Sequence, residues 1–91
     1  GDFVKDFRHE RLLTVPATDI AMKHVGRPVP NVPLLGAFAA LGGLVTIDAV
    51  HEAIGQKFGG KLAQGNIAAA DAAYQFVLDE KEEAARHAQA N

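Results

Sequence analysis

Two stretches of the chain carry apolar residues at the three- and four-residue spacing of an amphipathic helix. In residues 47–58 the apolar stripe consists of Ile47, Val50, Ile54 and Phe58. In residues 62–78 it consists of Ile67, Ala70, Tyr74 and Val77. We expect Thr46 to cap the first helix and Gly59-Gly60 to end it. The second helix is expected to begin between Leu62 and Asn66, because Gly65 weakens its first turn.

A third helix is predicted over residues 34–41, and it has no polar face. Every side chain in this stretch is apolar or absent, and Gly42-Gly43 follows it. Prolines at positions 28, 30 and 33 bar a helix just upstream, and Asn31 is placed to act as its N-cap. A helix that is apolar all round is normally covered all round. Its glycine and alanine residues would allow another backbone to approach closely.

Residues 11–16 have the composition of a short strand, which Pro16 would close because proline cannot donate to a ladder. Thr18 or Asp19 would then cap a helix over residues 20–25 that ends at Gly26. This order predicts an α/β fold with one strand followed by about four helices. A single strand needs neighbours from elsewhere, so we expect other protein to complete the fold. The alternative is a small all-α bundle in which residues 11–16 are merely extended.

The composition narrows the class of protein. The chain is 48% hydrophobic and 22% charged with a formal net charge of −2, as expected for a globular protein without a basic patch for nucleic acid. Its most apolar run, residues 34–45, is shorter than the roughly 20 residues of a membrane span. There is no cysteine, so the chain holds no disulfide, iron–sulfur or zinc–thiolate site. The N-terminus shows no apolar signal region, and we expect a cytoplasmic location.

The residues that carry chemistry form no recognisable catalytic set. The four histidines lack metal-ligand spacing, the chain contains no serine, and the acidic run at residues 80–83 has the pattern of a solvated face. We therefore predict neither catalytic residues nor metal ligands. Thr18 is the candidate for a phosphate contact, because it lies at the start of a predicted helix, where N–H groups can face a phosphate. Asn31 could hold a backbone at an interface. The alternative for each is simple helix capping.

The order of several short motifs resembles a known family, the gamma subunit of pyruvate:ferredoxin and related 2-oxoacid oxidoreductases. The resemblance covers about residues 12–76. It begins with the segment V-P-A-T-D-I-A. The motifs that follow are Asn31 with Leu35-Gly36-Ala37, Ala49 to Ile54, Lys57-Phe58, and Asn66-Ile67 with Ala69. The family domain is roughly twice as long, and its first strands and glycine-rich turn have no counterpart here.

This resemblance implies a fold and a function. Residues 11–78 would be the C-terminal half of a Rossmann-like gamma domain, with residues 1–10 as an extension and residues 79–91 as a charged, helical or frayed tail. The complex would convert a pyruvate-like 2-oxoacid to an acyl-CoA, using thiamine diphosphate, Mg²⁺, iron–sulfur clusters and coenzyme A, and pass electrons to ferredoxin or a similar carrier. This chain would be a subunit or fragment that is not catalytic alone, binds no cofactor alone and contacts other subunits. By this resemblance Thr18 and Asn31 would face coenzyme A or a neighbouring subunit.

A second hypothesis remains open. The chain would then be a non-enzymatic helical interaction module that oligomerises through residues 34–45.

Overall fold

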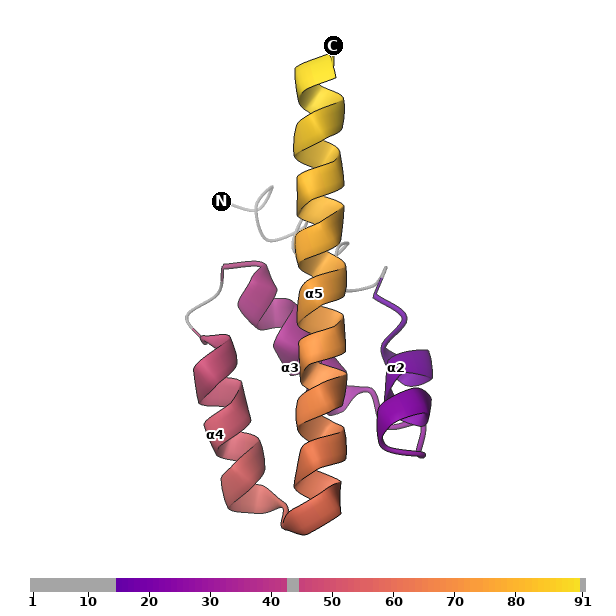
Figure 1. The fold of residues 1–91 in the computed structure, drawn as a ribbon, viewed down its shortest axis with the longest axis vertical. Helices are drawn as coiled ribbons and strands as arrows, with labels where there is room; N and C mark the ends of the chain where they lie inside the picture. Colours follow the sequence, from indigo (N-terminus) through magenta and orange to yellow (C-terminus); the bar gives the residue numbers. More distant parts are fainter. Residues whose placement is uncertain (1–14, 43–44, 91) are drawn as a thin grey trace.

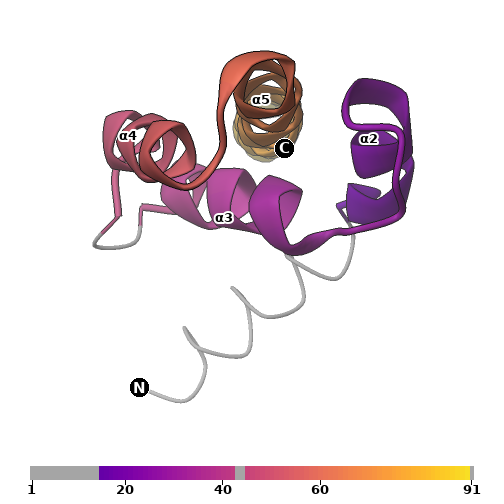
Figure 2. The same ribbon diagram turned by 90° about the horizontal axis from the view of Figure 1, so that it is seen from below.

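The computed structural model describes residues 15–42 and 45–90, with side chains up to residue 86. In chain order its helices are α2 (Ala17–His24), α3 (Asn31–Ala40), α4 (Ile47–Lys57) and α5 (Gly60–Ala90). Figure 1 shows α5 as the long central helix, with α2 and α4 on either side of it. Seen from below in Figure 2, α3 lies beneath α5 and part of α4, and α2 lies beyond the start of α3.

The predicted α/β fold class is wrong for the described part of the chain, which contains helices and no strand. Most of the predicted strand, residues 11–14, lies outside the described residues. Its last two residues do not extend as a strand, because Pro16 has φ −77° and ψ 64° and Ala17 N donates to Val15 O at 2.8 Å. This is an inverse γ-turn. Pro16 O then accepts from Ile20 N at 3.0 Å, so the backbone passes directly into α2. The small helical alternative is therefore correct here.

Two of the three predicted side-chain caps are absent. Helix α2 begins at Ala17, earlier than predicted, so Thr18 lies inside its first turn, and Pro16 occupies the N-cap position. Asn31 is the first residue of α3, which Pro30 precedes as N-cap, and neither helix has a side-chain cap bond. The prediction for Thr46 is confirmed, because its side chain accepts a hydrogen bond from Ala49 N at 3.1 Å.

The apolar helix α3 is covered mainly by α5, through small residues on both helices. Ala37 and Ala40 of α3 are buried together with Ala73 and Val77 of α5. The close approach expected for α3 is thus confirmed. At the far end of α3, Lys81 of α5 donates from Nζ to Ala40 O at 3.1 Å. A cation at the carbonyl end of a helix is favourable, because it complements the helix dipole.

A second cluster joins α4 to the same central helix. Val50 and Ile54 of α4 are buried against Ala70 of α5. The stripe predicted for α4 therefore faces Ile67 and Ala70 of the α5 stripe, whereas Tyr74 and Val77 of that stripe belong to the cluster with α3. The core therefore consists of two separate clusters along α5, one shared with α2 and α3 and the other with α4 and part of α3.

Helix α5 continues well past its predicted end at Leu78 and reaches Ala90. Residues 79–86 are mainly Ala, Glu, Lys and Arg, which are strong helix formers. Arg86 also pairs with Glu83 at 3.0 Å and Glu82 at 3.6 Å on the exposed surface. The helical option for the predicted tail is therefore correct, and the end of α5 projects beyond α2, α3 and α4 (Figure 1). The division of the chain at residue 78 remains a prediction, and that point falls inside one unbroken helix.

None of the helices in the described ranges is both long and apolar enough to cross a membrane.

Candidate functional site

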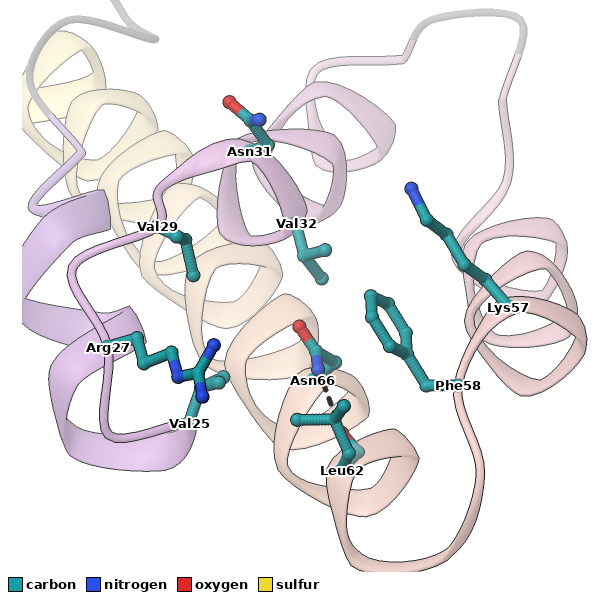
Figure 3. A pocket seen from close by; sticks show the side chains of 9 residues that line it. All are labelled: Val25, Arg27, Val29, Asn31, Val32, Lys57, Phe58, Leu62 and Asn66. Atoms are coloured by element: carbon teal, nitrogen blue, oxygen red, sulfur yellow. Dashed lines mark hydrogen bonds between the residues drawn. The ribbon is translucent and has the colours of Figure 1, made fainter.

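A pocket of about 250 Å³ opens at the end of the molecule where α2 and α4 end and α3 and α5 begin. Figure 3 shows it between the α2–α3 connection on one side and the α4–α5 connection on the other. Its apolar lining consists of Val25, Val29, Val32, Phe58 and Leu62. Its polar lining consists of Arg27, Asn31, Lys57 and Asn66.

Asn66 is the buried polar residue of this pocket. It is only 3% exposed, and its Nδ2 donates to Leu62 O at 2.8 Å within α5. This bond fixes the amide, so that the side-chain oxygen points away from Leu62 and into the pocket (Figure 3). The oxygen accepts no hydrogen bond from the described residues. Every fully buried side-chain oxygen in those residues has a hydrogen-bond partner. The unpartnered oxygen of Asn66 is therefore not fully buried and remains accessible from the pocket.

Two exposed cations flank the pocket. Arg27 reaches it from the α2–α3 connection and Lys57 from the last turn of α4, on the opposite side (Figure 3). Lys57 Nζ lies 5.8 Å from the centre of the Phe58 ring, which places the ammonium beside the aromatic wall. Neither cation forms an ion pair within the described residues.

The surroundings of the pocket are basic, although the whole chain carries a net negative charge. No Asp or Glu occurs in residues 20–47 or 53–70, the two sequence ranges that contain all of the lining residues, whereas they contain Lys23, Arg27, Lys57 and Lys61. The acidic run at residues 79–83 lies far along α5, towards the opposite end. An anion is therefore favoured at the pocket.

The structure does not bring the two predicted site residues together. Asn31 is exposed and contributes to the pocket lining. Thr18 is also exposed, but it follows Ala17, which packs with Ala40 and Val77 near the other end of α3. Any site that includes Asn31 in this pocket therefore excludes Thr18.

Sequence reasoning did not place Arg27, Lys57 or Asn66 in a site. A signal was available for two of them, since Lys57-Phe58 and Asn66 belong to the motifs on which the family resemblance rests. With Asn31, three of those motifs converge on one pocket. Their separation in the sequence hid this convergence, because only the packing of α4 and α5 against α3 brings them together.

A shallower hollow lies between α4 and α5, where His51 Nε2 and Asp71 Oδ1 are 2.5 Å apart. Both side chains remain accessible, at 34% and 51%. The pair links the two helices across their exposed edge. Within residues 15–42 and 45–86, no three His, Asp or Glu side chains are grouped as metal ligands would be.

The helical fold thus presents a basic, largely apolar pocket at this end. Comparison with known proteins places the chain in a family. Residues 4–76 match the family Pyruvate ferredoxin/flavodoxin oxidoreductase, and the chain belongs to that family. The family resemblance noted in the sequence is thus confirmed.

Several curated relatives share substantial identity with the chain. The pyruvate synthase subunit PorC of Methanothermobacter marburgensis is 43% identical over 75 residues, which are 82% of this chain and 41% of that protein. The common subunit gamma of the pyruvate/ketoisovalerate oxidoreductases of Pyrococcus furiosus is 42% identical over 66 residues, or 72% of this chain and 36% of that protein. The chain thus spans about two fifths of the length of these relatives. No solved structure gives a significant match.

Proposed function

We propose that the chain is part of the gamma subunit of a 2-oxoacid:acceptor oxidoreductase. The assembled enzyme would cleave the bond between the carboxylate and the keto carbon of a pyruvate-like acid and release CO₂. The remaining acyl group would be transferred to the thiol of coenzyme A. The two electrons lost by the substrate would pass to ferredoxin or a similar carrier. The family match over residues 4–76 is the observation that carries this proposal.

Within this enzyme the chain serves assembly and is not catalytic alone. The names of its relatives describe subunits of pyruvate synthase or of pyruvate/ketoisovalerate oxidoreductases, which supports this role. Exposed apolar side chains also remain for contact with other protein, among them Met22 at 49% and Leu35 at 46%. We retain a cytoplasmic location as part of the proposal.

The residues of this chain do not fit the iron–sulfur clusters or the Mg²⁺ of thiamine diphosphate that such an enzyme uses. With no cysteine, the chain has no thiolate to bind an iron–sulfur cluster. Its described residues contain no cluster of carboxylates and histidines for the Mg²⁺ of thiamine diphosphate. We therefore assign the thiamine diphosphate, Mg²⁺ and iron–sulfur chemistry of the complex to other subunits or domains.

The coenzyme A side of the enzyme is where this chain would act. Coenzyme A carries phosphates, which the basic end around Arg27 and Lys57 would attract. Asn31 remains a proposed contact because it lines the pocket. Thr18 remains one only as a contact to a neighbouring subunit or to a distant part of the ligand, since it lies outside the pocket.

Co-purification tests the assembly role. The tagged chain is expressed together with the larger oxidoreductase subunits encoded in the same genome. We expect it to carry with it brown, cluster-bearing subunits in a fixed ratio. A colourless chain recovered without them would overturn the proposed function.

The burial of the small residues of α3 argues against the alternative of an interaction module that oligomerises through residues 34–45. Gly36, Ala37 and Ala40, the small residues that such a contact would use, are already buried inside the fold. Ala40→Glu would therefore be expected to unfold the chain itself rather than separate folded copies.

A further inference from the structure

We propose that one side of α3 is the docking surface for an apolar segment of this same chain, residues 3–13. The surface is the outer stripe, formed by Leu34, Phe38 and Leu41, which follow one another at four and three residues and therefore lie on one side of the helix. Residues 3–13 precede the described part of the chain. They are identified by the uncovered stripe, by the point at which the chain enters the fold and by their own sequence pattern.

The outer stripe is apolar surface that the described residues cover only in part. Its three side chains are partly buried, and Leu35 beside them is 46% exposed. Phe38 belongs to neither apolar cluster of the described residues, whereas Gly36, Ala37 and Ala40 form the side of α3 that meets α5. Helix α3 contains no charged residue that could hydrate the stripe. A helix of this composition is normally covered all round, so we expect a partner for the stripe outside the described residues.

The chain enters the described fold next to the outer stripe. Val15 is only 7% exposed, and it belongs to the apolar cluster against which Leu34 and Leu41 also pack. The eight residues from Phe7 to position 14 can span about 26–29 Å when extended, and the ten residues of α3 are about 15 Å long. The segment can therefore reach every point of the stripe without a long connection.

The sequence of residues 3–13 suits a surface without charge. Phe3, Val4 and Phe7 are separated by one, three and four residues, a spacing that would place them on one side of a helical turn. Between and after them stand the charged residues Lys5, Asp6, Arg8, Glu10 and Arg11. Burying the three apolar side chains against the stripe removes apolar area of both partners from water, while the charged side chains stay solvated.

The covalent link favours this segment over a separate molecule. A short tether keeps an attached segment at an effective concentration in the millimolar range, and the entropy cost of closing the loop grows only slowly with its length. A second copy of the chain would have to approach that concentration to displace the segment. In the free chain the stripe is therefore covered by residues 3–13, whereas Leu35 remains open to other protein.

A single tryptophan reports whether the contact exists, because the 91-residue chain contains none. In Phe7→Trp we expect the folded chain to emit at shorter wavelength than the chain unfolded in urea, and acrylamide to quench the emission weakly. Lys5→Trp is the matched control, since position 5 lies off the apolar pattern, and it should be quenched readily. Equal quenching of the two variants, with circular dichroism showing an intact helical fold, would overturn the inference.

A charge placed within the stripe tests the other side of the contact. Phe7→Trp combined with Phe38→Glu should lose the shift to shorter wavelength, because the segment could not cover a carboxylate without burying its charge. Phe7→Trp combined with Met22→Glu should keep the shift, since Met22 is an apolar side chain of α2 that is 49% exposed. An unchanged shift in the Phe38→Glu variant would show that the segment does not cover the stripe. If that variant failed to fold, the comparison of quenching at positions 7 and 5 would still decide.

Dilution distinguishes the segment from a second copy of the chain as the occupant. The emission of Phe7→Trp should stay at shorter wavelength at every protein concentration at which sedimentation shows a monomer. If the shift disappeared as dimers dissociated, a second copy would cover the stripe and the inference would be wrong. No other subunit is present in these measurements, so their outcome does not depend on the proposed function.

Discussion

Gly36 of α3 lies directly against the backbone of Ala70 in α5. A Cβ atom added to Gly36 would come within 2.7 Å of the carbonyl carbon of Ala70 and 2.9 Å of its Cα, and closer still to its carbonyl oxygen. Neither backbone can move far, because Ala37 on α3 and Ala69 and Ala73 on α5 are themselves buried. The distance between the two helices is therefore set by the missing side chain of Gly36.

Gly36→Ala should destabilise the chain by about 1–3 kcal/mol, the usual cost of forcing extra volume into a packed contact. Urea unfolding followed by circular dichroism measures this loss. Gly55→Ala is the matched control, since a Cβ at that helical position has open space around it. We expect it to stabilise the chain by about 0.5–1 kcal/mol through its higher helix propensity. Equal effects at both positions would show that α3 and α5 do not approach as described.

Thr46→Ala should cost about 1 kcal/mol of unfolding free energy, because it removes the side-chain oxygen that caps Ala49 N. Thr18→Ala is a control of the same chemistry on α2, where the hydroxyl caps nothing. It should change stability by less than about 0.5 kcal/mol. Thermal unfolding of the two variants compares them directly, and a larger loss for Thr18→Ala would contradict the placement of both residues.

Lys81→Met keeps the aliphatic stem of the side chain and removes its hydrogen bond to Ala40 O. We expect a loss of about 1–2 kcal/mol, since the donor is charged and the contact is partly buried. Lys61→Met serves as the control, because Lys61 is exposed and has no hydrogen bond to the described residues. Chemical denaturation should show a loss only for Lys81→Met, and an unchanged midpoint for that variant would exclude the contact.

His51 and Asp71 should be coupled weakly. Their side chains remain 34% and 51% exposed, and exposed ion pairs contribute at most about 1 kcal/mol. A double-mutant cycle with His51→Ala and Asp71→Ala measures the coupling, which should fall further when salt is added. A coupling energy above about 2 kcal/mol would mean that the pair is better shielded from water than the structure indicates.

The helices could be predicted where the signals were local. The spacing of Val50 and Ile54, the cap at Thr46 and the small residues of α3 each depend on a few neighbours in the sequence, and the structure confirms all three. A strand over residues 11–16 could not be distinguished in this way from a segment that leads into a helix. A short apolar run before a proline is compatible with both. For the described residues of this run, Val15 and Pro16, the backbone turn at Pro16 leads into α2.

The pocket lay beyond sequence reasoning for a different reason. Arg27, Lys57 and Asn66 lie on three separate segments, and nothing in their immediate neighbours indicates a shared site. Capping was also misjudged at Thr18 and Asn31, because Pro16 and Pro30 take the N-cap positions and shift both helix starts. The first error concerns where separate segments lie relative to one another, which periodicity does not specify. The second concerns the residue at which each helix begins.

The most direct test of the account is the activity of an oxidoreductase reconstituted with and without this chain. Pyruvate- and coenzyme A-dependent reduction of a low-potential dye would be followed under anaerobic conditions. We predict that the complex lacking the chain shows little activity and that adding the chain restores it. Equal activity of both preparations at every concentration of coenzyme A would contradict the assignment of this chain to the enzyme.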